Sequence, residues 1–449
     1  MRNMTMHDGL PVVVIGAGPV GLAAAAELAE RNIPFRIIEK APAAAGAVSA
    51  WAHVRLFSPW RFNVSDAAAR LLAETGWRRP PEDVHPTGGE LIRDYLAPLA
   101  AHPAIVPHLQ TDAEVVAVAR AGTDRVRDAG REARPFLVRL RSAAGETEML
   151  ARAVIDTSGT WSHPNRALSG GLGALGETEP AVAAHIAYAM PDVLGQARAR
   201  YAGRRVAVLG SGHSAIGTLL DLGRIAAEAP GTSIVWLLRA DSVESAYRSG
   251  ADDQLAERGA LATTMGGLVA SGRIAVRTGI RVARLAAAEG ALAIVTDGGD
   301  RLEVDELVVA TGFRPDHGLA AELRLALDPA LECPVALAPL IDPNQHSCGT
   351  VRPHGHAALA HPDAGYFIAG MKSYGRAPTF LMATGHEQVR SIVAHLAGDD
   401  RAAADVRLVL PETGVCSTDR IGGATTEPGK AQSCCGGGTA AARVLETQD

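Results

Sequence analysis

The chain has 449 residues, of which 47% are hydrophobic and 20% are charged, and its formal net charge is -6. This composition excludes global disorder, and the lack of a basic run argues against nucleic acid as a partner. The length predicts about two or three domains. No long uninterrupted apolar segment occurs in the chain, and no signal-like region precedes the first predicted strand, so we expect a cytoplasmic protein with no membrane partner.

A glycine fingerprint, PVVVIGAGPVG at residues 11–21, follows a predicted strand and opens an alanine-rich helix predicted over 22–30. Gly16 permits the tight turn, Gly18 lets the backbone approach a pyrophosphate, and Gly21 lets the helix pack closely on the strand. The pattern predicts a dinucleotide site. A tight turn that binds no ligand is the alternative.

A second strand, predicted over 35–38, ends in Glu39, which lies close to the expected distance in sequence for an acid that binds a ribose. This fingerprint is assigned to FAD. Later strand ends that carry small residues are expected to approach the same cofactor. The residues assigned to the FAD site in addition to the three glycines and Glu39 are Pro19, Lys40, Val115, Ser158, Gly159, Thr311, Gly312, Gly370 and Thr384.

A second fingerprint, RRVAVLGSGHSAIG at residues 204–217, has Gly210, Gly212 and Ala215 at the corresponding positions. The next predicted strand ends in Arg239 instead of an acid. A guanidinium can bind a ribose phosphate that a carboxylate would repel, so the sequence favours NADPH over NADH. A solvated cation at the end of the strand is the alternative. Three more residues of this loop are assigned to the nucleotide: Ser211, His213 and Ser214.

The predicted fold class is α/β, with two Rossmann-like domains, the second inserted in the first. The predicted parts are residues 8–165 and 301–400 for FAD, 166–300 for NADPH, and a tail over 401–449 rich in glycine and containing cysteines. Helices are predicted over 66–75, 88–101 and from an N-cap at Thr384 to Leu396, and strands over 114–118, 136–141, 153–156 and 233–238. Rotation between the domains is expected near residues 163–170 and 312–316.

Taken together, residues 10–400 resemble the flavoproteins with two dinucleotide-binding domains, which include thioredoxin-reductase-like disulfide reductases and class B flavin monooxygenases. A disulfide reductase of this type needs a CxxC or CxxxxC pair, and neither spacing occurs in the chain. Many flavoproteins of this superfamily are dimers, so a homodimer is compatible with the resemblance.

The segment GAVSAWAHVRLFSPWRFNVSD, residues 46–66, is similar to the loop of flavin-containing monooxygenases that ends in an asparagine facing the flavin. The resemblance implies that Asn63 hydrogen-bonds the flavin hydroperoxide and that Arg55 and Trp60 line the pocket. His53 is a further candidate for a proton donor, and an ordinary packed or exposed histidine is the alternative.

A stretch that precedes the second fingerprint in class B enzymes is only partly present here. It keeps His185 and Tyr188 but lacks the phenylalanine and glycine of the pattern. The strings SAWAHVRLFSPW, GSGHSA, HSCGTVRPHG and PTFLMATGHEQVRS resemble flavin monooxygenases associated with bacterial arsenic resistance. This resemblance implies an FAD- and NADPH-dependent monooxygenase that uses dioxygen to oxidise a small, soft nucleophile, with arsenite and methylarsenite as candidate substrates.

The cysteines point in the same direction. Trivalent arsenic prefers thiolates, and Cys416, Cys434 and Cys435 lie on the glycine-rich tail, where they are candidates for binding an arsenical; a tolerated flexible terminus is the alternative. Cys348 lies near His346, His354 and His356 and is interpreted as an active-site or structural thiol. Cys333 is predicted to lie in the core. No structural metal site is predicted, because the zinc-ligand spacing is missing. Two other functions stay open: an NADPH-dependent reductase of disulfides or thiophilic metals that uses the tail cysteines, and a flavoprotein sensor without catalysis.

Overall fold

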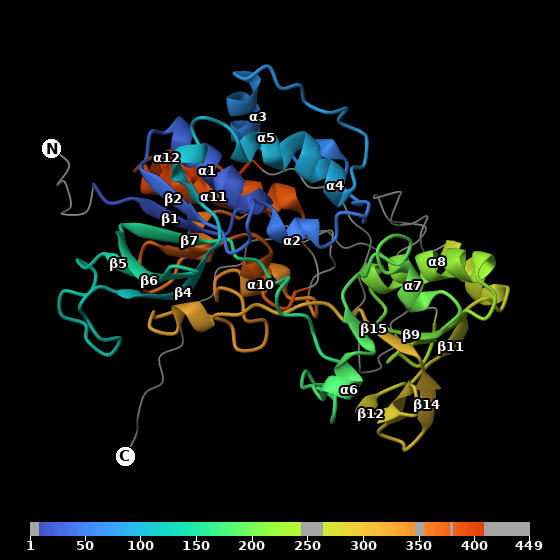
Figure 1. Cartoon of the computed structure of the whole chain (residues 1–449). Helices are drawn as coiled ribbons and strands as arrows, with labels where there is room; N and C mark the ends of the chain where they lie inside the picture. The colour runs from blue at the N-terminus through green and yellow to red at the C-terminus, as the bar shows by residue number, and fades with distance from the viewer. Residues whose placement is uncertain (1–8, 244–263, 346–353, 378–379, 408–449) are drawn as a thin grey trace, which may run out of the picture. The chain divides into compact units, whose positions relative to one another are not determined.

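The structure is a computed structural model, and it describes residues 9–243, 264–345, 354–377 and 380–407. Within these ranges the chain builds two parallel sheets and two smaller antiparallel sheets (Figure 1). None of the described helices is both long and apolar enough to cross a membrane.

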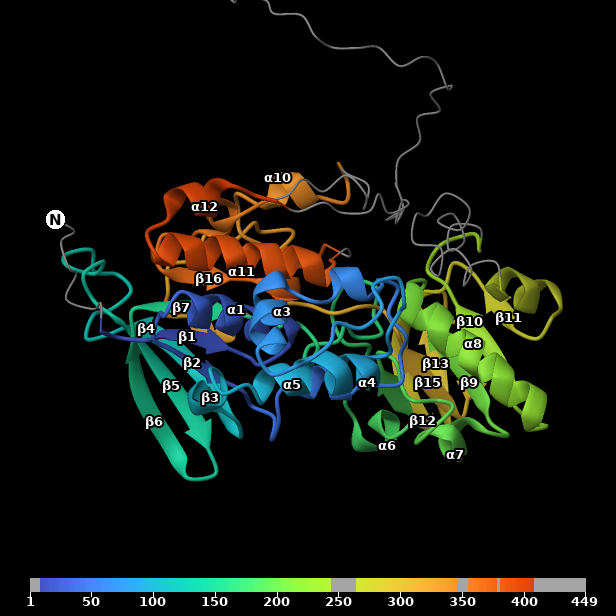
Figure 2. The ribbon, with the colours of Figure 1, turned by 90° about the horizontal axis from the view of Figure 1, so that it is seen from above.

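The first parallel sheet has five strands in the order β16-β7-β1-β2-β3. Every residue of β1 and of β7 is buried, as expected for strands of a parallel sheet that is covered on both faces. Figure 2 shows β7, β1 and β2 next to helices α1 and α11. The bounds are β1 Val12–Ile15, β2 Phe35–Ile38, β3 Leu109–Gln110, β7 Ala153–Asp156, β16 Tyr366–Ile368, α1 Pro19–Glu30 and α11 Met382–Leu396.

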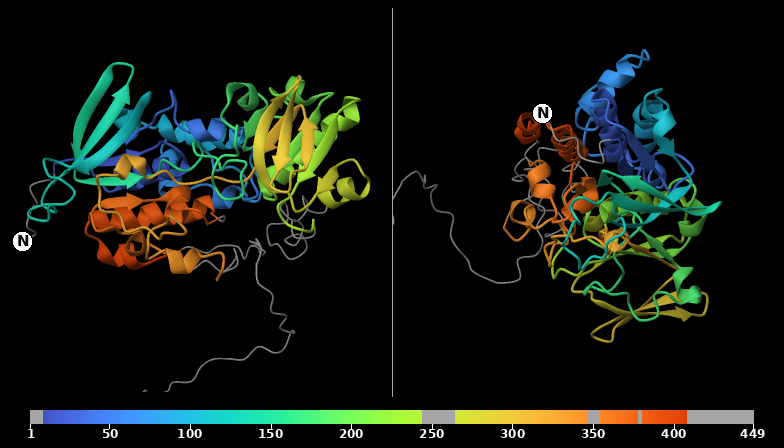
Figure 3. Two further views of the ribbon diagram at one scale, coloured as in Figure 1. Left: turned by 90° about the horizontal axis from the view of Figure 1, so that it is seen from below. Right: turned by 90° about the vertical axis from the view of Figure 1, so that its left-hand side faces the viewer.

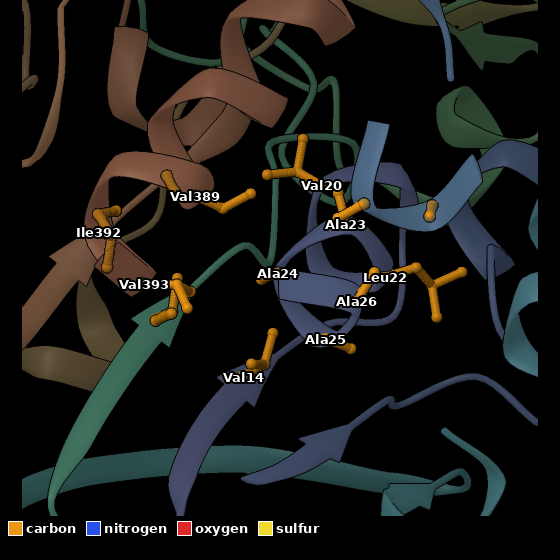
Figure 4. Packing of buried hydrophobic residues seen from close by; sticks show 14 of the residues in the cluster. Val14, Val20, Leu22, Ala23, Ala24, Ala25, Ala26, Val389, Ile392 and Val393 are labelled. Atoms are coloured by element: carbon orange, nitrogen blue, oxygen red, sulfur yellow. The ribbon is translucent and has the colours of Figure 1, made fainter. Parts of the chain in front are cut away.

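Alanines allow α11 to pack closely on α1. The four consecutive residues from Ala23 to Ala26 are completely buried, and Val389, Ile392 and Val393 of α11 are completely buried in the same cluster (Figure 4). Methyl groups in place of longer side chains leave room for the branched side chains of the partner helix. The N-termini of both helices lie together at the carboxyl edge of the first sheet. Their close approach is visible at Gly385 of α11, where a Cβ atom would lie 2.5 Å from Cγ2 of Val20 in α1.

Further elements of this domain include an antiparallel sheet of β4 (Ala113–Arg120), β5 (Phe136–Ser142) and β6 (Gly145–Ala151), seen in Figure 3. The helix predicted over 88–101 consists of α4 (Gly88–Leu91), a π-helical turn over Ile92–Leu96 and α5 (Ala97–Ala100). Pro98 has no N–H to donate to the carbonyl of Asp94, and the indole of Trp77 donates to that carbonyl instead, at 2.7 Å. The shorter elements are α2 Gly46–Ser49, α3 Asp66–Ala73, α10 Ala338–Ile341 and 3-10 turns at Trp60–Phe62, Val106–His108, Gly318–Ala320, His356–Leu359 and Gly370–Tyr374.

The second parallel sheet has the order β11-β10-β9-β15-β8. Strand β15 pairs with both β9 and β8, so the chain returns to the first domain after Val309 and not at the predicted boundary of 301. The bounds are β8 Ile186–Tyr188, β9 Arg205–Leu209, β10 Ser233–Leu237, β11 Ala275–Arg277, β15 Glu306–Val309, α6 Pro180–Ala183, α7 Arg198–Tyr201 and α8 His213–Glu228. An antiparallel sheet of β12 (Val282–Ala288), β13 (Ala291–Thr296) and β14 (Arg301–Val304) completes this domain.

The two segments that connect the domains lie side by side. The amide of Asn165 donates to the carbonyl of Gly312, and the amide of Arg314 donates to the carbonyl of His163, both at 2.9 Å. The rings of Trp161 and Phe313 stack across the same pair of segments with centroids 4.9 Å apart. These are the segments where rotation between the domains is expected.

Two predictions near the C-terminus need correction. Helix α11 begins at Met382 with Leu381 as its N-cap, so Thr384 lies inside the first turn and does not cap the helix. Part of the predicted tail is folded, because helix α12 (Asp400–Ala404) packs on α11 and buries Ala403. The carbonyl of Ala403 accepts a hydrogen bond from Ser391 at 2.6 Å.

Candidate cofactor and active site

The turn between β1 and α1 has the geometry that the first fingerprint predicts. Gly16 has a φ of +95°, which few other residues adopt, and no atom lies within 4 Å of the position where Gly18 would carry a Cβ. The backbone at Gly18 therefore faces open space that a side chain would fill. A pyrophosphate fits this cradle.

Neither fingerprint helix has a side-chain cap at its N-terminus. The N-cap residues are Gly18 for α1 and Gly212 for α8, and glycine has no side chain that could accept from the first amides. By comparison, Ser65 caps α3 and Thr87 caps α4. Uncapped amides at a helix N-terminus attract anions through their N–H groups and the helix dipole. Both fingerprints are thus suited to phosphate.

Glu39 lies at the end of β2 with its carboxylate turned toward the fingerprint. It is 7% exposed and accepts hydrogen bonds from the amides of Ala17 (2.7 Å) and Ala41 (2.9 Å). These bonds fix the carboxylate next to the turn and leave lone pairs for a ribose. Of the other residues predicted for this site, Pro19 is the first residue of α1, Lys40 donates to Ser162, and Val115 is buried in β4.

The ends of β7 and β16 carry the remaining residues of the predicted FAD site. Ser158 is exposed, and Gly159 and Gly370 have positive φ values of +69° and +75°. The amide of Gly370 donates to Gln388 of α11 at 2.8 Å, which ties the end of β16 to that helix. Thr384 is buried in the first turn of α11 and hydrogen-bonds Tyr374.

Sequence reasoning missed a buried ion pair at the same two strand ends. Nζ of Lys372 lies 2.6 Å from Oδ2 of Asp156, and the two side chains are 1% and 0% exposed. Tyr366 donates to the same carboxylate, at 2.9 Å. The available signal was a lysine two residues after the apolar strand-end sequence YFIAG, where a buried charge needs a partner.

The second fingerprint forms a tight turn against β15. Gly210 has a φ of +136°, and a Cβ there would lie 2.3 Å from the carbonyl oxygen of Ala310. The indole of Trp236 donates to the carbonyl of Gly210 at 2.7 Å and holds the loop. Ser211, Gly212, His213 and Ser214 continue the loop into the first turn of α8.

Arg239 follows β10 at the carboxyl edge of the second sheet. It is exposed, and no ion pair to it is found in the described part of the chain. Arg277, also exposed, ends the neighbouring strand β11, and its Cα is in register with that of Leu237. Two guanidinium groups at adjacent strand ends suit a phosphate.

Thr311 and Gly312 lie in the segment that returns to the first domain. The side-chain amide of Asn165 donates to the carbonyl of Thr311 at 2.8 Å, and Gly312 has a φ of +90°. His185 precedes β8 and Tyr188 is its last residue. His185 Nδ1 lies 2.8 Å from the carbonyl of Asp305, and the Tyr188 hydroxyl donates to Glu177 at 2.6 Å.

Asn63 is completely buried, and its amide is held from both ends by one residue. Oδ1 accepts from the hydroxyl of Ser58 at 2.7 Å, and Nδ2 donates to the carbonyl of Ser58 at 2.8 Å. Within the described ranges, Ser58 is the one acceptor found for Nδ2, which has a second proton to donate. Trp60, 3% exposed, lies in the same 3-10 turn, and its carbonyl accepts from the amide of Asn63.

Among the described residues, no hydrogen bond joins Arg55 or His53 to Asn63. The guanidinium of Arg55 is about half exposed, donates to the carbonyl of His85 and lies 3.7 Å from Glu90. His53 is partly exposed and acts electrostatically on Asp221 of α8. Two residues farther along the chain than Arg55, Phe57 contacts the ring of His213 with centroids 5.0 Å apart.

Of the five cysteines only Cys333 lies within the described residues. It is completely buried, as predicted, and burial raises the pKa of its thiol to about 12. Residues Cys348, Cys416, Cys434, Cys435 and His346 lie outside the described ranges.

The histidines predicted to cluster with Cys348 have different partners. His354 is bonded to Gln388 at 2.9 Å, whereas His356 stacks on His395 with centroids 4.4 Å apart. In the part of the chain that the structure describes, no group of three or more His, Cys, Asp or Glu side chains is placed to hold a metal ion.

The sequence profile of the pyridine nucleotide-disulphide oxidoreductase family matches residues 13–335. The chain belongs to this family. It is therefore an FAD-dependent oxidoreductase that works with a pyridine nucleotide, and the arginine after β10 fits NADPH as that nucleotide. No curated protein matches the chain.

Solved structures of two kinds share the fold. Bacillithiol disulfide reductase Bdr from Bacillus cereus is 19% identical, with a TM-score of 0.63, and the match covers 87% of this chain and 99% of that one. The FAD-bound cadaverine monooxygenase DfoA from Erwinia amylovora is 14% identical, with a TM-score of 0.60, covering 92% and 99%. A flavin-containing monooxygenase from Stenotrophomonas maltophilia is 20% identical, with a TM-score of 0.51, covering 86% and 99%. At these identities the similarity establishes the fold.

Proposed function

We propose that the protein is an NADPH-consuming flavin monooxygenase that transfers one oxygen atom of dioxygen to a soft nucleophile. The observation that carries the proposal is the amide of Asn63, which is buried and oriented by Ser58 with one N–H left for a ligand. A fixed, neutral donor in a dry site suits an oxygen atom on which negative charge develops.

Separate groups of residues would bind the two cofactors. The turn at Gly16 to Gly21 and Glu39 would hold FAD, and the loop from Gly210 with Arg239 would hold NADPH. Bound FAD supplies the activation of dioxygen once NADPH has reduced it. Trp60, which is buried in the same 3-10 turn, would form an apolar wall that limits the access of water to Asn63.

Trivalent arsenicals, arsenite and methylarsenite, are the substrates that we propose. An As(III) lone pair is a soft nucleophile, and arsenic binds thiolates strongly. Cys416, Cys434 and Cys435 would capture the arsenical. The resemblance of several sequence strings to monooxygenases of arsenic resistance supports the same substrate.

The second candidate function is a reductase of disulfides or thiophilic metals that uses the tail cysteines. The solved relatives include a disulfide reductase, which keeps this candidate open. However, no pair of cysteines in the chain has the CxxC or CxxxxC spacing, and Cys333 is buried with a raised pKa, which suppresses the thiolate.

The test is to measure NADPH consumption and dioxygen uptake together, with and without arsenite or methylarsenite. The matched variant is the full chain with Cys416, Cys434 and Cys435 all replaced by serine. We expect stimulation by the arsenical that depends on dioxygen, and a higher KM for the arsenical in the variant. Stimulated NADPH consumption without dioxygen uptake would establish the reductase instead.

A further inference from the structure

Lys372 and Asp156 form an ion pair that the reaction scheme above does not use. Both side chains are almost completely buried, and the two charged atoms are 2.6 Å apart. Burial of two charges is expensive, and an apolar pair of similar volume would serve packing as well or better. The pair therefore calls for an explanation beyond stability.

The carboxylate of this pair is fully satisfied, whereas the ammonium is not. Oδ1 of Asp156 accepts from the amide (3.0 Å) and the hydroxyl (2.6 Å) of Ser158, and Oδ2 accepts from Tyr366 and Lys372. Burial alone would raise the pKa of Asp156, but the ammonium and these hydrogen bonds outweigh burial and lower it. Lys372 donates to Asp156 and, at 3.1 Å, to the hydroxyl of Ser158, which gives two acceptors for three protons among the described residues.

The ion pair lies beside the cofactor turn. Ser158 is exposed, and a Cβ atom at Gly16 would lie 3.4 Å from the Cα of Ser158. Ser158, whose hydroxyl accepts from Lys372, thus links the ion pair to the cofactor turn.

The order of the strands places the pair at one particular end of FAD. Glu39, which suits the adenosine ribose, ends β2, while Asp156 ends β7 on the other side of β1. A pyrophosphate bound at the turn after β1 would direct the flavin end of the cofactor toward the side of β7 and β16. Lys372 follows β16, so its charge would lie on the side of the flavin.

The neighbouring histidine, His317, does not add a second positive charge. Burial lowers the pKa of His317, and the ammonium of Lys372 lowers it further, so the ring is neutral. Its Nε2 lies 3.0 Å from the carbonyl of Glu332, while Nδ1 is buried without a partner among the described residues. Lys372 is therefore the cation of this cluster.

We propose that Lys372 is a positioning residue that acts through Ser158 on the redox equilibrium of bound FAD. Its ammonium favours the reduced, anionic flavin over the oxidised flavin. The carboxylate of Asp156 keeps the lysine charged and in place. The inference rests on the binding of FAD alone and not on the oxygenation or on arsenicals.

A lysine near a dinucleotide has one other obvious role, which is to hold the pyrophosphate. The two roles differ in a measurable way. The pyrophosphate carries the same charge in both redox states, so a lysine that binds it strengthens the binding of oxidised and of reduced FAD equally. A lysine that acts on the flavin ring strengthens the binding of the reduced form alone. Its removal then changes the ratio of reduced to oxidised flavin at a fixed redox potential.

The experiment measures the affinity for oxidised FAD and, anaerobically, the reduced fraction of bound flavin against a reference dye. The variants are Lys372→Met, the conservative Lys372→Arg, and Tyr366→Phe, which removes one donor to Asp156 without changing a charge. The double variant Asp156→Asn/Lys372→Met removes both charges. It avoids the unpaired buried carboxylate that Lys372→Met alone leaves and that destabilises the fold.

We expect Lys372→Met, which leaves the carboxylate of Asp156 without its cation, to lower the reduced-to-oxidised ratio about tenfold or more. The double variant, which also removes the opposing carboxylate, should lower the ratio by a smaller factor. Both should bind oxidised FAD within about threefold of wild type. Lys372→Arg and Tyr366→Phe should stay near the wild-type ratio. An unchanged ratio in both folded variants overturns the proposal, and so does an equal loss of affinity for both redox states. Because neither substrate nor dioxygen is present, these outcomes are separate from a failure of the proposed oxygenation.

Discussion

A Cβ atom placed on Gly21 would lie 2.0 Å from the carbonyl oxygen of Gly16 and 2.7 Å from Oγ1 of Thr157. The first contact is with backbone that cannot move without opening the turn between β1 and α1. The hydroxyl of Thr157 in turn donates to the carbonyl of Ile15 at 2.7 Å, so the turn is braced from the neighbouring strand as well. The shape of the FAD cradle depends on this contact between two glycines.

Replacement of Gly21 by alanine should therefore abolish the binding of FAD. The measurement is the FAD content per chain after purification, together with the dissociation constant for added FAD. Gly217→Ala is the matched control, since Gly217 lies inside helix α8 with no atom within 4 Å of its Cβ position. It should keep FAD and stabilise the fold by roughly 0.5–1 kcal/mol. Full FAD content in the Gly21 variant would show that the cofactor does not use this turn.

Arg239 should decide between the two pyridine nucleotides. Removing the guanidinium in Arg239→Ala deletes a charge-assisted bond to a ribose phosphate, so KM for NADPH should rise about tenfold or more while that for NADH is unchanged. The measurement is kcat/KM for both nucleotides at two salt concentrations. Arg301→Ala, at a surface ion pair of β14, is the control. An equal loss with NADH would assign Arg239 to folding or to a contact that both nucleotides share.

Asn63 should control how tightly NADPH oxidation is coupled to product. Asn63→Ala removes the oriented donor, so hydrogen peroxide released per NADPH should rise severalfold while FAD remains bound. Ser58→Ala keeps the amide but removes the hydroxyl that orients it, and an intermediate effect is expected. Peroxide and product are measured in the same reaction. Unchanged coupling in Asn63→Ala would remove this residue from the mechanism.

Local patterns predicted much of the fold. The glycine turns, the strands that precede them and the buried Cys333 follow from short stretches of sequence, because tight turns and continuous apolar runs need no distant partner to be recognised. The first residue of α11 was missed because Leu381, which has no capping side chain, precedes the helix. The domain boundary at 301 was wrong because the pairing of β15 with β9 joins segments about one hundred residues apart.

The candidate site was only partly predictable for the same reason. Lys372 and Asp156 are separated by 216 residues, and nothing near either of them in sequence indicates the partner. The orientation of Asn63 by Ser58 spans five residues, yet it depends on a 3-10 turn that the sequence pattern does not reveal. Chemistry that rests on long-range pairing appears only with the three-dimensional structure.

The free energy of unfolding should decrease at acidic pH because two histidines, His361 and His386, are buried. Burial lowers the pKa of His361 to about 4 and that of His386 to about 4, and the Nε2 atoms of both rings are buried without a partner among the described residues. In the unfolded chain these rings titrate near 6.5. Between pH 6.5 and 4 the unfolded state therefore binds more protons than the folded state, so the free energy of unfolding decreases as the pH falls through this window.

The change should reach about 3 kcal/mol for each histidine, because each pKa unit corresponds to roughly 1.4 kcal/mol. His361→Gln removes one titrating ring, and the difference in unfolding free energy between variant and wild type, measured by urea at pH 7 and pH 4.5, isolates its share from that of the carboxylates. The variant should be less stable than wild type at pH 7 and close to it at pH 4.5. His163→Gln, at a half-exposed ring, is the control and should show no such convergence. A difference that stays constant across the two pH values would mean that His361 is charged, or exposed to water, in the folded protein.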